Sequence, residues 1–109
     1  LFDRGISHVM AEVREIVGDK PTYCSYDIDF VDPTFAPGTG TPEIGGPNSF
    51  QAQQVIRALD GVNLIGADLV EVSPPFDAGG GTAWLGVSLM FELICVLSQS
   101  IQFCRNSCV

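Results

Sequence analysis

An α/β fold with a mainly parallel sheet is predicted by the order of three segments in this chain. Thr22 to Ile28 is rich in β-forming residues, residues 49 to 59 have helical periodicity, and Leu64 to Val72 is a short apolar run. Strand, helix and strand in this order indicate a parallel unit, because parallel strands require a crossover connection.

A helix is expected before this unit, over residues 6 to 17. Its apolar residues recur at three- and four-residue intervals, the spacing of one helix face, and Gly18 with Asp19 ends the pattern. His8 lies on the flank of that face, with no other metal-type ligand at helical spacing. We expect His8 to be an exposed helix residue rather than a catalytic group.

The segment from Asp32 to Pro47 is rich in proline and glycine, so it predicts one long, shaped loop. Asn48 or Ser49 can cap the helix that follows, which ends at Asp60 and Gly61. The buried stripe expected on this helix consists of Ala52, Val55, Ile56 and Leu59.

The run Leu64 to Val72 predicts a strand buried on both faces, closed by Ser73 and two prolines. A last helix is expected to run to about Ser98, with Thr82 as its cap. Trp84 and Phe91 on this helix are expected in the core. Residues 99–109 show no clear periodicity and are predicted to be an irregular tail.

Composition excludes several classes of partner. The chain has 109 residues and a formal net charge of −8, which repels nucleic acid and anionic lipid. The most apolar run, Ala83 to Leu97, is shorter than the ~20 residues of a membrane span and contains Glu92. The four cysteines have no disulfide-rich spacing, so reduced thiols and an intracellular, cytoplasmic protein are expected. They are Cys24, Cys95, Cys104 and Cys108.

Asp27 and Asp29 are the candidate metal ligands. Alternate strand residues point to the same side, so both carboxylates would project together if the strand extends that far. At the carboxyl end of a parallel strand they would lie where open α/β sheets bind ligands. Carboxylate oxygens suit hard cations such as magnesium, calcium or manganese. Asp32, just before Pro33, is expected to organise the turn instead.

Three strings in the chain resemble the ureohydrolase family of arginases and agmatinases. They are SYDIDFVDPTFAPGTGTPEIGG (Ser25 to Gly46), ADLVEVSPPFD (Ala67 to Asp77) and GTAWLGVSLMFELICVL (Gly81 to Leu97). The resemblance implies an arginase-like three-layer αβα sandwich with a mainly parallel sheet, present here in part. Residues 1–98 would then be the carboxyl-terminal part of a ureohydrolase domain, and 99–109 the irregular tail.

The resemblance also implies a reaction and its residues. A hydroxide bridging two Mn²⁺ ions would hydrolyse a guanidino group to urea and an amine. Asp27 would bridge both ions and Asp29 would bind one of them. Glu71 matches the glutamate that pairs with the substrate guanidinium, and Thr41 would shape the pocket wall. The TPEIGG and SPPFD strings favour agmatine, with guanidinobutyrase or guanidinopropionase activity as the alternative.

Two motifs of the family, of the forms GGDHS and DAHxD, do not occur in this chain. The chain alone is therefore expected to bind manganese weakly, to be inactive and, with uncovered sheet edges, to be marginally stable. As part of a longer enzyme it would belong to a homo-oligomer, a trimer or hexamer, in the cytoplasm or in a eukaryotic mitochondrion. Two alternatives remain: a truncated, non-catalytic relative that packs on other subunits, and a nucleotide-sugar transferase that uses an Asp-x-Asp site.

Overall fold

A computed structural model describes residues 4–107, with side chains described to residue 102. The predicted order of helices and strands is confirmed. The elements are α1 (Ile6–Val17), β1 (Thr22–Asp27), the 3₁₀ turn η1 (Ile28–Phe30), α2 (Ser49–Arg57), β2 (Leu64–Val70), η2 (Pro74–Phe76), η3 (Ala78–Gly80) and α3 (Gly81–Ser107).

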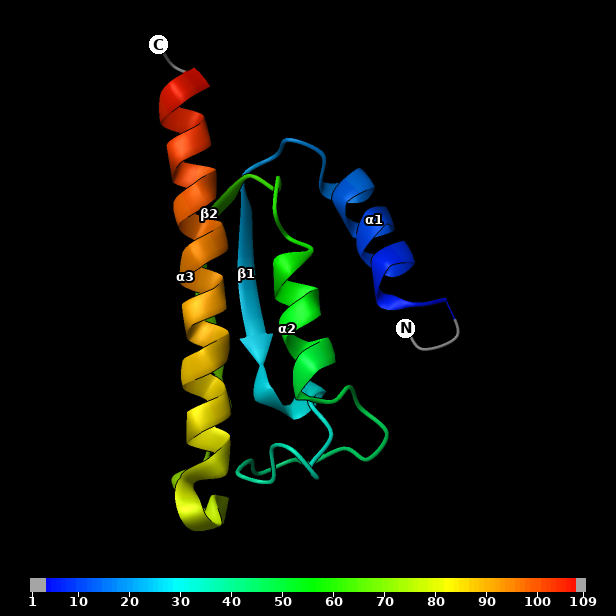
Figure 1. Ribbon diagram of the computed structural model, residues 1–109, viewed down its shortest axis with the longest axis vertical. Coiled ribbons are helices and arrows are strands. Elements are labelled where there is room, and N and C mark those ends of the chain that lie inside the picture. Colours follow the sequence, from blue (N-terminus) through cyan, green and yellow to red (C-terminus); the bar gives the residue numbers. More distant parts are fainter. Residues whose placement is uncertain (1–3, 108–109) are drawn as a thin grey trace.

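The two strands pair in parallel, as predicted. Their register runs from Thr22 opposite Leu64 to Asp27 opposite Val70, with one irregularity after Thr22. Both strands therefore end at the same edge of the sheet. In Figure 1 this is the lower end, where the long loop after β1 and the first turn of α3 also lie.

The core lies between the strands and the helices α2 and α3. Its most buried large side chains include Ile28, Ile56, Leu64, Leu89 and Leu93. The hydroxyl of Tyr26 donates to the carbonyl of Ala52, 3.1 Å away, which ties β1 to α2. α1 lies beside α2 (Figure 1), where a guanidinium nitrogen of Arg14 donates to the carbonyl of Ala58 at 2.5 Å.

The opposite face of the strands is open among the described residues, with Tyr23 and Ile65 exposed. The expectation that the second strand is buried on both faces is therefore not met in this part of the chain. That strand is also shorter than predicted: it ends at Val70, because Glu71 has a φ of 74° and leaves the extended conformation.

Asn48 caps α2, one of the two residues predicted to do so. Its side chain accepts from the backbone N–H of Gln51 at 2.8 Å, and the Gln51 side chain accepts from the N–H of Asn48 at 2.9 Å. This reciprocal pair satisfies two N–H groups that would otherwise lack a partner at the helix start. The loop after β1 therefore ends at Asn48, where the cap begins α2.

α3 is longer than predicted and runs to Ser107, so the prediction of an irregular tail is wrong for residues 99–107. No glycine or proline follows Gly86 to end the helix. The hydroxyl of Ser100 also donates to the carbonyl of Leu64 at 3.0 Å, which holds this part of the helix to β2. Residues 108 and 109 lie outside the described part.

The placement of Trp84 and Phe91 in the core is also wrong, since they are 77% and 65% exposed. They belong to one apolar stripe along α3, at spacings of three, four and seven residues; its members are Trp84, Val87, Phe91, Ile94 and Ile101. The core receives the other face of the helix, which includes Leu89 and Leu93.

Within the described residues, one segment, Ala78–Gln102, is long and apolar enough to cross a membrane by length and composition alone. The core helix of a soluble protein can meet the same test. In the middle of this segment Glu92 forms two hydrogen bonds with Arg57 of α2, at 2.7 and 3.1 Å. The helix also packs against β2. These contacts are those of a helix packed in an α/β layer.

Candidate metal and substrate site

Asp27 and Asp29 lie together on one tight turn, although not on one strand. β1 ends at Asp27, and Asp29 falls in η1, so the expectation that both project from an extended strand is wrong. The turn joins them instead, because an Asp27 carboxylate oxygen accepts from the backbone N–H of Asp29 at 2.9 Å. Asp27 is exposed and Asp29 is half-buried.

The Asp29 carboxylate is held by the loop that follows. The hydroxyl of Thr39 donates to its Oδ1, and the hydroxyl of Thr41 donates to its Oδ2. Thr41, predicted to shape the pocket wall, is thus placed beside a predicted metal ligand and is exposed. Thr39 was not predicted from the sequence, and it is only 3% exposed. The Thr-x-Thr spacing was the available signal, but only the folded loop shows which carboxylate the hydroxyls reach.

Asp32 organises the loop, as predicted. Its carboxylate accepts from the backbone N–H groups of Thr34 and Gly45, each at 2.9 Å. These hydrogen bonds lower the pKa of Asp32, and the bond from Thr34 contributes most. Gly46 fits where the two arms of the loop meet, since a Cβ there would lie 2.4 Å from the carbonyl oxygen of Phe30. The first and last residues of the loop are therefore held against each other.

Gly38 attaches the middle of the same loop to the segment between β2 and α3. Its N–H donates to the hydroxyl of Thr82 at 2.8 Å, and its carbonyl accepts from the N–H of Ser73 at 2.7 Å. A Cβ at residue 38 would lie 2.6 Å from the Cβ of Asp77 and 2.9 Å from that of Thr82. Only glycine lets the loop approach this closely.

Thr82, predicted to cap the last helix, does not do so, because its hydroxyl is bonded to Gly38. The side chain at the start of α3 that accepts the helix N–H groups is Asp77. Its two oxygens accept from the N–H groups of Thr82 at 2.8 Å and Ala83 at 2.9 Å. These hydrogen bonds lower the pKa of Asp77, and the bond from the Thr82 N–H contributes most.

Glu71 comes directly after β2, one residue beyond the pairing of Val70 with Asp27. It therefore lies at the same sheet edge as the two aspartates. A positive φ at a residue other than glycine costs about 1–3 kcal/mol and is typical of functional sites. The side chain is exposed, so the expected penalty for burying this carboxylate does not arise among the described residues.

The chemistry of these donors fits a hard divalent cation, since carboxylate oxygens are the ligands that Mn²⁺ prefers. Each carboxylate oxygen has two lone pairs, so hydrogen bonds to Asp29 leave sites for a metal. The number of donors is incomplete. Among the side chains of residues 4–102, no group of three or more His, Cys, Asp or Glu is placed to hold one ion. The described residues thus bring two candidate carboxylate donors together without a complete set of ligands.

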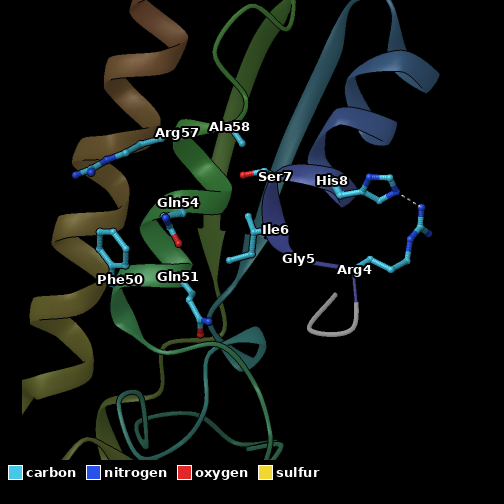
Figure 2. A pocket seen from close by; sticks show the side chains of 10 residues that line it. All are labelled: Arg4, Gly5, Ile6, Ser7, His8, Phe50, Gln51, Gln54, Arg57 and Ala58. Atoms are coloured by element: carbon cyan, nitrogen blue, oxygen red, sulfur yellow. Dashed lines mark hydrogen bonds between the residues drawn. The ribbon is translucent and has the colours of Figure 1, made fainter.

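A separate open hollow of about 730 Å³ lies between the start of α1 and one side of α2. Figure 2 shows Phe50, Gln51 and Gln54 along its α2 side, whereas His8 turns away from α2 toward Arg4, 2.8 Å away. His8 is exposed, as predicted. No carboxylate of the described residues lines this hollow, which is therefore unlike the aspartate turn.

The arrangement described so far is an α/β layer with carboxylates at the carboxyl edge of its sheet, and comparisons with known proteins identify its family. Residues 1–95 match the model of the arginase family, to which the chain belongs. It is 60% identical over 96 residues to a guanidinopropionase of Pseudomonas aeruginosa, and 56% identical over 96 residues to a guanidinobutyrase of the same organism. Each alignment covers 88% of this chain and 30% of the relative. The chain therefore spans about a third of the length of these relatives.

The fold agrees with a solved structure of the family. The proclavaminate amidino hydrolase of Streptomyces clavuligerus superposes with a TM-score of 0.87 and 39% identity, over 91% of this chain and 33% of that one. The prediction of an arginase-like αβα fold, present in part, is confirmed. Residues 4–107 supply one layer of helices and two parallel strands of it.

Proposed function

We propose that this chain is part of a ureohydrolase that hydrolyses a linear guanidino compound to urea and an amine, with Mn²⁺ as the metal. The observation that supports this most directly is the position of Asp27, Asp29 and Glu71 at one edge of a parallel sheet, in a member of the arginase family. Carboxylates at that edge can bind both a metal and a cationic substrate.

In this proposal Asp27 and Asp29 would hold the metal, Asp27 as a ligand shared by two ions and Asp29 as a ligand of one. Bound Mn²⁺ would supply an activated hydroxide and would stabilise negative charge as the guanidino carbon becomes tetrahedral. The chain's own contribution is to hold its two carboxylates at a fixed place. Asp27 is restrained by the N–H of Asp29, and Asp29 by two threonine hydroxyls.

Glu71 would bind and orient the substrate. A carboxylate can accept two parallel hydrogen bonds from a planar guanidinium, a strong and directional arrangement. The positive φ of Glu71 turns the chain at the end of β2, beside the strand that ends in Asp27. Thr41, exposed on the adjoining loop and bonded to Asp29, would shape the pocket wall beside the metal ligands.

Agmatine is the substrate that the signature strings favour. The relatives point to more than one substrate. This chain is 60% identical to a guanidinopropionase, 56% identical to a guanidinobutyrase, and 55% identical over 89 residues to a mitochondrial agmatinase of Gallus gallus. A difference of five percent in identity does not separate a guanidino-amine from a guanidino-acid. We therefore propose agmatine first and 3-guanidinopropionate and 4-guanidinobutyrate as the second class.

The test is urea release with added Mn²⁺ from each of the three compounds. It is run on this chain and on the longest natural form that contains it. The expected result is activity in the long form alone, lost in Asp27→Ala and retained in Asp19→Ala, an exposed aspartate at the other end of β1. Inactivity of both forms would contradict the proposal.

A non-catalytic relative that packs on other subunits is the second candidate. It is favoured by the incomplete donor set among the side chains that the structure describes, those of residues 4–102. The two candidates differ in what the long form contains: a catalytic enzyme needs further histidine and aspartate ligands, and the packing role does not. In either case we propose a homo-oligomer, a trimer or hexamer, which sedimentation of the long form would measure.

A further inference from the structure

Thr39 occupies a position that the proposed reaction does not by itself explain. Among the described residues its hydroxyl is hydrogen-bonded neither to the predicted substrate contact Glu71 nor to Asp27, but donates to Oδ1 of Asp29. Thr41 donates to the other oxygen of the same carboxylate, but Thr41 is exposed and Thr39 is buried. An exposed hydroxyl can be replaced by water, whereas a buried one cannot without leaving the carboxylate unpaired.

The backbone around Thr39 is fixed from two sides. Its own N–H donates to the carbonyl of Pro37 at 2.9 Å, and the neighbouring Gly38 is bonded to both Thr82 and Ser73. Thr82 is fully buried and stands in the first turn of α3. Two hydrogen bonds, joined by the peptide bond between Gly38 and Thr39, therefore link Thr82 at the start of α3 to the carboxylate of Asp29.

We infer that Thr39 is a positioning residue, which holds the Asp29 carboxylate in the orientation that binds the metal, and that Thr82 fixes Thr39 in turn through Gly38. Ligands held by hydrogen bonds of this kind lose affinity for the metal when the partner is removed. The inference rests on the proposed function, because it assumes that Asp29 binds Mn²⁺.

The test measures Mn²⁺ affinity, from the electron paramagnetic resonance signal of the free ion, in the longest natural form containing this chain. Thr39→Val keeps the shape of the side chain and removes the hydroxyl, and Thr39→Ser keeps the hydroxyl. We expect Thr39→Val to weaken binding about 10- to 100-fold, and Thr39→Ser to bind like the unaltered protein. Thr41→Val should have a smaller effect, because water can replace its hydroxyl.

Thr22→Val is the matched control, since the Thr22 hydroxyl donates to the carbonyl of Lys20 at the other end of the sheet. It should leave the affinity unchanged. If Thr39→Val does not fold, Thr82→Val tests the same link at its α3 end, because Thr82 holds Gly38 beside Thr39. Weaker Mn²⁺ binding is expected from this variant too. Folded variants at both positions that bind as tightly as the unaltered protein would overturn this inference alone. No Mn²⁺ binding by the unaltered protein would overturn the proposed function as well.

Discussion

The two ends of this parallel sheet are built in different ways. At the amino end short turns enter the strands: Leu59 and Val62 are buried there, and the backbone N–H of Thr22 donates to the carbonyl of Asn63 at 2.9 Å. At the carboxyl end a long loop and the segment before α3 meet, and although Val31 and Ala36 of that loop are buried, polar contacts are added to the apolar ones. Side chains such as Asp29 and Asp32 bond there to hydroxyls and backbone N–H groups.

The difference shows how one small unit can separate stability from chemistry. Apolar burial is non-directional, so it holds the amino end without setting the orientation of any polar group. Hydrogen bonds are directional, so at the carboxyl end they hold carboxylates in defined orientations and leave two of them, Asp27 and Glu71, exposed. Substitutions at the two ends should therefore have different consequences for metal binding.

The largest effect is expected from Asp27→Ala at the carboxyl end. Loss of a proposed bridging ligand should weaken Mn²⁺ binding in the long form by more than about 100-fold, beyond what removal of a hydrogen-bonding partner produces. Titration of free Mn²⁺ and urea release both measure it. Asp19→Ala at the amino end is the control, and equal losses from both substitutions would contradict the comparison.

A large effect on stability alone is expected from Leu59→Ala at the amino end. This side chain is 9% exposed, and its truncation should cost about 2–4 kcal/mol in the free energy of unfolding. Chemical denaturation measures the loss. Mn²⁺ affinity of the remaining folded protein should stay unchanged; a parallel fall in affinity would show that the two ends are coupled.

An intermediate effect on both properties is expected from Gly38→Ala. The added Cβ would lie 2.6 Å from that of Asp77, so the loop or the start of α3 must shift, at a cost of about 1–3 kcal/mol. Affinity for Mn²⁺ should fall too, because Thr39 moves with its neighbour. Gly40→Ala is a matched control, since a Cβ at residue 40 meets nothing within 4 Å. Identical melting temperatures for the two variants would count against a tight contact at Gly38.

The smallest effect is expected from pH acting on Asp77. Because hydrogen bonds lower its pKa in the folded protein, Asp77 contributes stability above the ordinary value of 3.8, and this contribution is lost as pH falls through the lowered pKa. Asp77→Asn should therefore make the melting temperature fall less steeply in that acid range. Identical acid profiles for the unaltered protein and for Asp77→Asn would exclude the effect.

Local features of the chain were enough to predict the elements that depend on short-range interactions. The periodicity of residues 6–17, the capping residue Asn48, and the parallel order of β1 and β2 all follow from neighbouring residues and chain direction. The aspartate pair and Glu71 are candidates that residue type and resemblance pointed to, and their roles stay predictions. The helix and its cap depend on residues close in sequence, whereas the parallel pairing joins residues far apart and follows from the crossover that such strands require.

Tertiary structure decided what depends on contacts between distant segments. Only the folded loop shows that Asp29 lies on a turn held by Thr39, that Asp77 rather than Thr82 accepts the first N–H groups of α3, and that Trp84 faces away from the core. The face of an apolar helix that is buried depends on how the helix is rotated against β2, which its own periodicity does not specify. A hydroxyl in a glycine-rich loop likewise has no defined partner until the loop closes, because the choice is made by groups ten or more residues away.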